Sequence, residues 1–208
     1  MPQFLFDGPE AASTTVALAH GAGAPMDSAF IAFFAEGLAA QGYRVVRFEF
    51  PYMAARRRDG SRRPLDRPNV LLDTWQSVID HLRPERLVVG GKSLGGRMAS
   101  MIADAAGVQG LVCLGYPFHP PSQPEKLRIA HLRSLRTPAL ILQGTRDPFG
   151  TRDEIVRLPL SPAIHLHFLE DGDHGFTPRA ASGLSERQNW EEALGVLSRF
   201  LEARNLVA

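Results

Sequence analysis

Short apolar runs alternate with longer segments of helical spacing from residue 13 to the end of the chain. Several runs, such as LVVG and ALIL, are apolar at successive positions, which is typical of strands covered on both faces, as in parallel sheets flanked by helices. The predicted strands are 14–20, 43–50, 86–92, 110–116, 138–144 and 163–170.

Helical segments occupy the intervals between these runs. Residues 27–42 place three phenylalanines and a leucine on one face, with Asp27 as the predicted N-cap and Gly42 as the predicted end. Further helices are predicted at 69–82, 95–106 and 185–204. Strands and helices in this order predict an open, mostly parallel α/β sheet of six or seven strands with helices on both faces. Ligands of such sheets meet the loops at the carboxyl ends of the strands.

The length and composition favour one soluble domain covering residues 1–208, with 44% hydrophobic and 22% charged residues. No stretch approaches the ~20 apolar residues of a transmembrane helix, and the first residues lack the pattern of a secretory signal. The lone cysteine, Cys113, allows no intrachain disulfide. We therefore expect a cytoplasmic protein without a membrane partner.

Charge is uneven although the net formal charge is only +1. Segment 52–68 carries about +4 and the remainder about −3. We expect this segment to be a loop at the carboxyl edge of the sheet, either solvated or folded over a site where it would favour a carboxylate or phosphate on the substrate. Sparse aromatic residues and the low net charge predict no nucleic-acid partner. Its arginines are Arg56, Arg57, Arg58, Arg62, Arg63 and Arg67.

The pentapeptide Gly91-Lys92-Ser93-Leu94-Gly95 fits the pattern G-x-S-x-G. The pattern alone is weak, but here it follows a predicted strand and begins a predicted helix. A sharp turn at this point needs small residues at Gly91 and Gly95, so that the backbones pass closely. The hydroxyl of Ser93 would then stand clear as a nucleophile, beside the first amides of the helix.

A serine hydroxyl needs a base to remove its proton, and the base in turn needs an orienting acid. His174 follows the last predicted strand, in a loop free to reach across the sheet edge, and Asp147 follows the preceding strand. Asp171 and Asp173 are too close in sequence to His174 to arrive from another loop. The remaining histidines lie on predicted helices, strands or turns: His20, His81, His119, His131, His165 and His167. His20 belongs to a turn that would bring backbone N–H groups towards Ser93.

Metal and phosphate-loop interpretations are weaker. His165 and His167 share one face of a strand near two aspartates, but paired imidazoles of this kind are more often structural, so we expect no metal and no cofactor. The pattern G-x-x-x-x-G-K-[ST] fails around GGKS because Arg86 stands where its first glycine is required.

The motifs HGAGAPMDS, FEFPYM, GGKSLGGR, GYPFHPP, LQGTRDPFG and DGDHGF span residues 20–176 in this order. With them the chain resembles small serine hydrolases of the α/β-hydrolase superfamily, in the dienelactone-hydrolase-like branch. The resemblance implies a minimal α/β-hydrolase fold with a catalytic triad of Ser93, Asp147 and His174. It also implies an oxyanion hole formed by the backbone N–H groups of Ala22 and Leu94. True dienelactone hydrolases carry cysteine at the nucleophile position, so dienelactone is not the substrate we expect.

The predicted reaction is hydrolysis of the carboxylic ester or thioester of a small molecule through an acyl-enzyme intermediate. Only about 20 residues, several of them prolines, separate the strands at 116 and 138, which leaves little or no cap for enclosing a long apolar substrate. The alternative is a binding or scaffold protein that keeps the α/β-hydrolase fold without turnover. The sequence does not indicate the oligomeric state.

Overall fold

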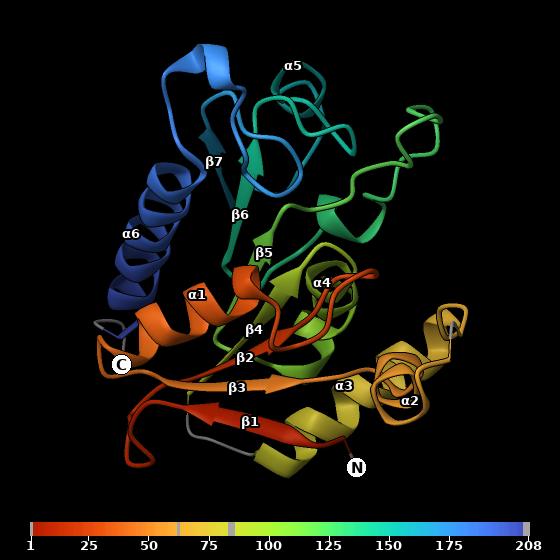
Figure 1. Cartoon of the computed structure of the whole chain (residues 1–208), viewed down its shortest axis with the longest axis vertical. Helices are drawn as coiled ribbons and strands as arrows, with labels where there is room; N and C mark the ends of the chain where they lie inside the picture. Colours follow the sequence, from red (N-terminus) through yellow and green to blue (C-terminus); the bar gives the residue numbers. More distant parts are fainter. Residues whose placement is uncertain (1, 62, 83–85, 206–208) are drawn as a thin grey trace.

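A seven-stranded sheet runs through the computed structural model, which describes residues 2–61, 63–82 and 86–205 (Figure 1). The strand order is β1-β3-β2-β4-β5-β6-β7, and all neighbours are parallel except the antiparallel pair β1 and β3. The strands are β1 (Phe4–Asp7), β2 (Thr15–Ala19), β3 (Arg44–Phe48), β4 (Leu87–Lys92), β5 (Gly110–Leu114), β6 (Ala139–Gly144) and β7 (Ile164–Leu169). This is the predicted open α/β sheet.

Helices cover both faces of the sheet, as predicted. One apolar cluster joins one face of the central strands to α3 and α4, and a second joins the other face to α1 and α6. The central strands β2, β5 and β6 are buried at every residue, which explains their apolar runs. The helices are α1 (Ala29–Ala39), α2 (Pro51–Asp59), α3 (Pro68–Leu82), α4 (Leu94–Ala106), α5 (Arg152–Ile155) and α6 (Glu186–Asn205), with 3-10 turns at His131–Arg133 (η1) and Ala180–Ser182 (η2).

The expected ends of α1 are wrong. Its N-cap is Ser28, without a side-chain hydrogen bond, and its C-cap is Ala40 rather than Gly42. The Asp27 carboxylate instead accepts two hydrogen bonds from Arg57, at 2.7 and 2.9 Å, because a guanidinium offers it a charged, bidentate partner. Strand β1 is an addition to the six runs identified in the sequence.

Segment 52–68 is only in part the loop that its charge suggested, since its described residues between 60 and 67 lie outside helices and strands. Its first part belongs to α2, which begins at Pro51 and ends with Gly60 in the left-handed conformation, at φ 69°. Proline fits the first helical turn and glycine the C-terminal cap, so these two residues define the helix despite its polar composition. Arg62 lies outside the described residues.

The connection between β5 and β6 contains only η1 as regular structure, so no helical cap covers the sheet edge there. Cys113 is fully buried in β5. In the part of the chain that the structure describes, no helix is long and apolar enough to cross a membrane. The cytoplasmic location and the extent of the domain stay predictions.

Candidate active site

Ser93 lies in the turn between the end of β4 and the start of α4, at the carboxyl edge of the sheet. Its backbone has φ 50° and ψ −109°, a strained conformation for a residue with a side chain. The Ser93 N–H donates to the carbonyl of Leu114 at 3.1 Å, which ties the turn to the end of β5. The strand, turn and helix around the motif are therefore as predicted.

The two glycines of the motif allow this turn to pack against the end of β2. A Cβ atom on Gly91 would lie 2.0 Å from the carbonyl oxygen of Ala19, and one on Gly95 would lie 2.4 Å from the same oxygen. No side chain larger than hydrogen fits at either position without displacing backbone. The expectation of close backbone approach at Gly91 and Gly95 is confirmed.

The structure brings Asp147 and His174 together. His174 Nδ1 lies 2.7 Å from Asp147 Oδ2, and the Asp147 side chain is fully buried. Two further N–H groups donate to this carboxylate: Gln143 Nε2 to Oδ2 at 2.8 Å and the Phe149 backbone to Oδ1 at 2.8 Å. Because the ionised carboxylate only accepts, we assign the proton of the imidazole to Nδ1, which leaves Nε2 as a base.

Gln143 positions the acid, and the sequence analysis missed it. Its side chain is fully buried at the carboxyl end of β6, where Oε1 accepts from the Tyr116 N–H at 2.8 Å and Nε2 also faces the carbonyls of Tyr116 and Gly150 at 3.2 Å. The available signal was a single amide side chain in the otherwise apolar run ALILQG. A buried polar group in such a strand needs partners, and here they include the acid.

The loops that carry Ser93 and His174 meet around Gly115. The Lys92 ammonium donates to the His174 carbonyl, and a Cβ on Gly115 would lie 3.3 Å from His174 Nδ1. The Phe149 ring packs on the imidazole with centroids 4.3 Å apart. Among the described residues, the hydrogen bonds of His174 do not include one to the Ser93 hydroxyl. In unliganded enzymes this bond is often long and shortens when substrate binds.

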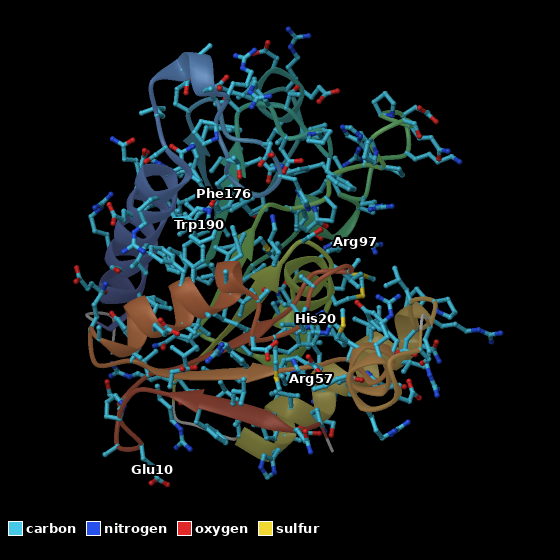
Figure 2. The ribbon with its side chains drawn as sticks, in the orientation of Figure 1. Glu10, His20, Arg57, Arg97, Phe176 and Trp190 are labelled. Carbon is cyan, nitrogen blue, oxygen red and sulfur yellow. The ribbon has the colours of Figure 1, made fainter. Side chains whose placement is uncertain are left out.

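The turn after β2 holds the second predicted oxyanion donor. His20 is buried between Phe50 and Gly21: its Nε2 accepts from the Phe50 N–H at 3.1 Å, so Nδ1 carries the proton that it donates to the Gly21 carbonyl at 2.6 Å (Figure 2). Burial lowers the pKa of His20, in keeping with a neutral ring. Because a peptide is planar and trans, fixing the Gly21 carbonyl also fixes the direction of the Ala22 N–H.

Tyr52 supports the same turn from α2. Its hydroxyl donates to the carbonyl of Ala22 at 3.1 Å, and its ring lies edge-on to His20 at 5.7 Å. Leu94, the other predicted donor, is the first residue of α4, where a backbone N–H has no acceptor within the helix. These positions agree with an oxyanion hole, whose role stays a prediction.

A second serine and histidine, Ser100 and His131, are also in contact, at 2.8 Å. Ser100 lies in the middle of α4, is almost fully buried, and donates its hydroxyl proton to the Arg97 carbonyl at 2.7 Å. Burial and the charge of Arg97 lower the pKa of His131. No carboxylate contacts His131 among the residues described. The pair therefore lacks both the partly exposed turn and the acid found at the Ser93 site.

Two other acids and one other histidine considered from the sequence have structural partners. Asp171 pairs with Arg146 and Arg179, while Asp173 accepts from backbone N–H groups of its own loop. His167 Nε2 lies 2.8 Å from Glu192. Within the described ranges, no group of three His, Cys, Asp or Glu side chains is arranged to hold a metal ion.

The three arginines of α2 have different surroundings, and Arg57 is the one that acids neutralise most directly. Arg57 contacts both Asp27 and the buried Glu49, and these partners raise its pKa. Arg56 donates to the carbonyl of Arg63. Arg58 is three-quarters exposed and lies 3.8 Å from Asp59. The charge of Arg57 is thus paired with acids from outside the segment, and that of Arg58 is turned to solvent.

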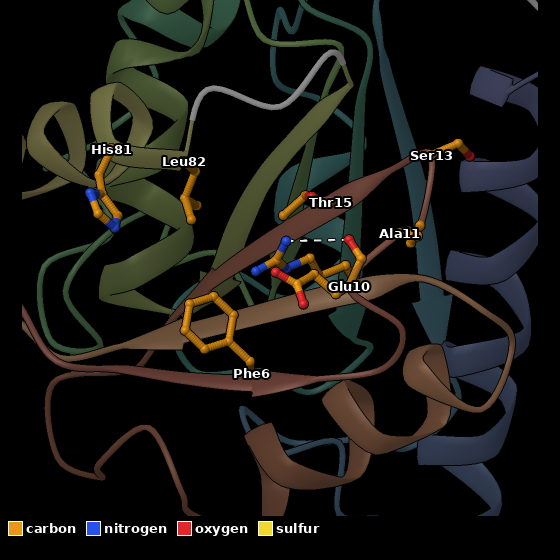
Figure 3. Close-up of a pocket in the computed structure, with 9 residues that line it drawn as sticks. Phe6, Glu10, Ala11, Ser13, Thr15, His81 and Leu82 are labelled. Carbon is orange, nitrogen blue, oxygen red and sulfur yellow. Dashed lines mark hydrogen bonds between the residues drawn. The ribbon is translucent and has the colours of Figure 1, made fainter.

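A hollow of about 460 Å³ lies at the opposite edge of the sheet, beside the first residue of β2 (Figure 3). Arg44 crosses it and donates to the Glu10 carbonyl at 3.3 Å. His81 at its border is stacked on Phe4, with ring centroids 5.3 Å apart. The lining residues include no nucleophile with an adjacent base, so the candidate active site remains at the carboxyl edge.

Lys92 supplies a pH-dependent test of the loop contacts. Burial lowers the pKa of Lys92 to about 8, and attraction to Asp147 and Asp173 offsets part of this effect. The unfolded chain, with a lysine pKa of about 10.4, binds more protons than the folded chain between these two values, so the Lys92 contribution to stability rises with pH across this window.

We expect the free energy of unfolding of the wild type, minus that of Lys92→Met, to increase by about 2 kcal/mol between pH 7 and pH 10. Urea titrations of both proteins at the two pH values measure this difference. A difference that stays constant with pH would show that the folded protein leaves the Lys92 pKa unchanged.

Comparison with known proteins identifies the family to which the chain belongs. The chain matches the family model for the alpha/beta hydrolase domain over residues 12–202 and belongs to this family. Among curated proteins it resembles the "Putative protein-lysine deacylase ABHD14B" of Pongo abelii, with 32% identity over 115 residues, or 54% of this chain. The matched segment covers 52% of that protein, so the chain aligns with about half of its relative.

Solved structures share the fold at low sequence identity. An α/β serine hydrolase without lid, XC6422 from Xanthomonas campestris, has a TM-score of 0.72 and 18% identity, covering 96% of this chain and 88% of its own. Est1E from Butyrivibrio proteoclasticus has a TM-score of 0.73 and 13% sequence identity, and the match covers 98% of this chain and 94% of Est1E. Dienelactone hydrolase from Anabaena variabilis has a TM-score of 0.71 and 21% sequence identity, and the match covers 93% of this chain and 89% of that enzyme. These matches confirm the predicted lid-less fold and the predicted structural similarity to dienelactone hydrolases.

Proposed function

We propose that this protein is a serine hydrolase that cleaves the carboxylic ester or thioester of a small molecule through an acyl-enzyme intermediate. The observation that carries the proposal is the buried Asp147 carboxylate bound to His174 Nδ1 at 2.7 Å, in loops that meet those of the strained Ser93 turn. An acid, a base and a partly exposed nucleophile, each following a different strand, are the parts that acyl transfer to water requires.

In the first half of the proposed reaction, the Ser93 hydroxyl attacks the carbonyl carbon and His174 Nε2 takes its proton. Asp147 keeps the Nδ1 proton in place and stabilises the positive charge on the ring. The carbonyl oxygen becomes an oxyanion, which the N–H groups of Ala22 and Leu94 stabilise. His174 then gives its proton to the leaving alcohol or thiol, and the acyl group stays on Ser93.

In the second half, His174 takes a proton from water, whose oxygen attacks the acyl-enzyme. The same two N–H groups stabilise the second oxyanion, and the proton returns to Ser93 as the acid product leaves. The short connection between β5 and β6 supports a small or exposed acyl group, because it adds no helical lid around the site.

The test is covalent labelling with a fluorophosphonate, which reacts with serines activated by a base. We expect one adduct, mapped by mass spectrometry to Ser93, and hydrolysis of p-nitrophenyl acetate by the wild type. Ser93→Ala should lose both signals. Ser100→Ala is the matched control, because Ser100 also contacts a histidine but lacks an acid, and it should keep both.

The rival hypothesis, a silent binding or scaffold protein with this fold, predicts a different result. It requires that the wild type and Ser93→Ala be equally unreactive towards the probe and the ester. An adduct on Ser100 instead of Ser93 would also overturn the proposed role of Ser93.

A further inference from the structure

Arg97 is a cation one helical turn after the candidate nucleophile, and no acid among the described residues pairs with it. It follows Ser93 by one turn of α4, and its backbone N–H donates to the Ser93 carbonyl at 2.9 Å. A helical side chain leans towards the N-terminus of its helix, so that of Arg97 is directed towards the turn that carries Ser93. Figure 2 places Arg97 on the side of the sheet edge that faces α2 and the segment after β5.

The Nε atom of Arg97 is buried without a hydrogen-bond partner among the described residues. Buried N–H donors are satisfied in most proteins, so an unpaired one beside a nucleophile needs an explanation, such as an acceptor supplied by a ligand. No carboxylate in the described residues forms an ion pair with Arg97, in contrast to Arg57.

A second arginine lies close to Arg97 on the segment after β5. Arg128 is partly buried, and its pKa is lowered first by burial and then by the charge of Arg97. The Tyr116 hydroxyl donates to the Arg128 carbonyl at 2.8 Å and so ties the backbone of this residue to the chain that follows β5. No carboxylate pairs with Arg128 among the residues described either.

His131 adds to the same group of positive or potentially positive side chains. Its Nε2 is held at 2.8 Å from the Ser100 hydroxyl, and Arg97 also lowers its pKa. Arg97 thus interacts with a second guanidinium and an imidazole in one partly buried region, and no acid of the described residues neutralises them. Such a cluster costs free energy through like-charge repulsion and desolvation unless an anion joins it.

We propose that Arg97 and Arg128 bind an oxyanion of the substrate, a carboxylate or phosphate separated by a short spacer from the carbonyl that Ser93 attacks. This rests on the proposed function and names its substrate class. In this proposal Arg97 and Arg128, rather than the arginines of segment 52–68, are the source of selectivity for anions. In α2, Arg57 is paired with acids, Arg56 is hydrogen-bonded to the Arg63 carbonyl and Arg58 is turned to solvent.

The experiment compares two esters of equal chain length, p-nitrophenyl hydrogen adipate and p-nitrophenyl hexanoate. Arg97→Gln should lower kcat/KM for the adipate ester about 10- to 100-fold, mainly through KM, and change the hexanoate value less than about 3-fold. Arg97→Lys should recover part of the loss. Arg58→Gln is the matched control, since it removes an exposed arginine, and both values should stay unchanged.

Inhibition by free anions distinguishes whether the site prefers a carboxylate or a phosphate. Adipate and inorganic phosphate are tested as competitive inhibitors of hexanoate hydrolysis, and the anion that inhibits more strongly identifies the preferred group. The inhibition should disappear in Arg97→Gln. The proposal is overturned if neither anion inhibits the wild type and Arg97→Gln lowers the two kcat/KM values equally.

A result without any turnover tests the two proposals separately. If the wild type hydrolyses neither ester, the proposed function fails, and anion binding is measured by the rise in unfolding temperature with adipate or phosphate. A rise in the wild type that is lost in Arg97→Gln supports the anion site. Equal unfolding temperatures with and without either anion overturn it.

Discussion

Asp147→Asn is expected to lower kcat for a short ester by about 10³- to 10⁴-fold, because the asparagine cannot satisfy the donors around this side chain. His174 Nδ1 and Gln143 Nε2 both point at Oδ2, and the Phe149 N–H points at Oδ1. In either orientation the amide of asparagine sets its NH₂ group against at least one of these N–H groups. When the NH₂ group faces His174, the imidazole favours the tautomer with Nδ1 unprotonated, which leaves Nε2 unable to accept the serine proton. When the oxygen faces His174 instead, the NH₂ group opposes the Phe149 N–H, and this buried clash disfavours that orientation.

The measurement is kcat for p-nitrophenyl acetate near pH 7.5, with Asp171→Asn as the control. Asp171 is also a carboxylate in the last loops of the chain, but it pairs with Arg146 and Arg179 and not with His174. The control should keep kcat within about 3-fold of wild type while losing some stability. A comparable fall in both variants would mean that Asp147 acts through folding alone.

The fold was largely predictable because its signals are local. A strand buried on both faces requires apolar side chains at successive positions, so β4, β5 and β6 appear directly as runs such as LVVG and ALIL. The Ser93 turn was predictable for the same reason, since glycines, serine, strand and helix are neighbours in sequence. Asp147 and His174 follow from the rule that loops at the carboxyl ends of parallel strands converge.

Features that depend on distant partners escaped the sequence analysis. Helix α2 contains three successive arginines, which suggested a solvated loop, yet Arg57 is held by Glu49 from the end of β3 and by Asp27 from before α1. Strand β1 is short and at an edge, none of its residues is fully buried, and it is identified only by its pairing with β3. No local pattern encodes either contact.

The supporting residues of the site were hidden for a similar reason. Gln143 was a lone amide in an apolar run, and Tyr52 stood in a segment that its charge had marked as a loop. Their roles become visible only when the hydroxyl of Tyr52 meets the Ala22 carbonyl and the amide of Gln143 meets Asp147. Arg97 is the opposite case, because its importance comes from the absence of an acid beside it among the described residues.

Gly91→Ala is expected to lower the free energy of unfolding by about 3 kcal/mol or more, through two separate effects. Gly91 has φ 147°, a region that residues with a side chain rarely adopt. An added Cβ would also lie 2.0 Å from the Ala19 carbonyl oxygen and 2.8 Å from the Ala19 nitrogen. Both contacts are with the backbone of β2, in the centre of the sheet, which cannot move away without breaking strand pairing.

Gly107→Ala separates the two effects. Gly107 ends α4 at φ 63°, but nothing lies within 4 Å of the position that its Cβ would occupy. Its substitution should therefore cost only about 1 kcal/mol, from backbone strain alone. Urea unfolding of both variants measures the difference, and equal losses would contradict the close packing of the Ser93 turn against β2. If the packing is as described, the strain at Ser93 is maintained by a backbone contact that only glycine permits, and the nucleophile is held in place by the core of the sheet.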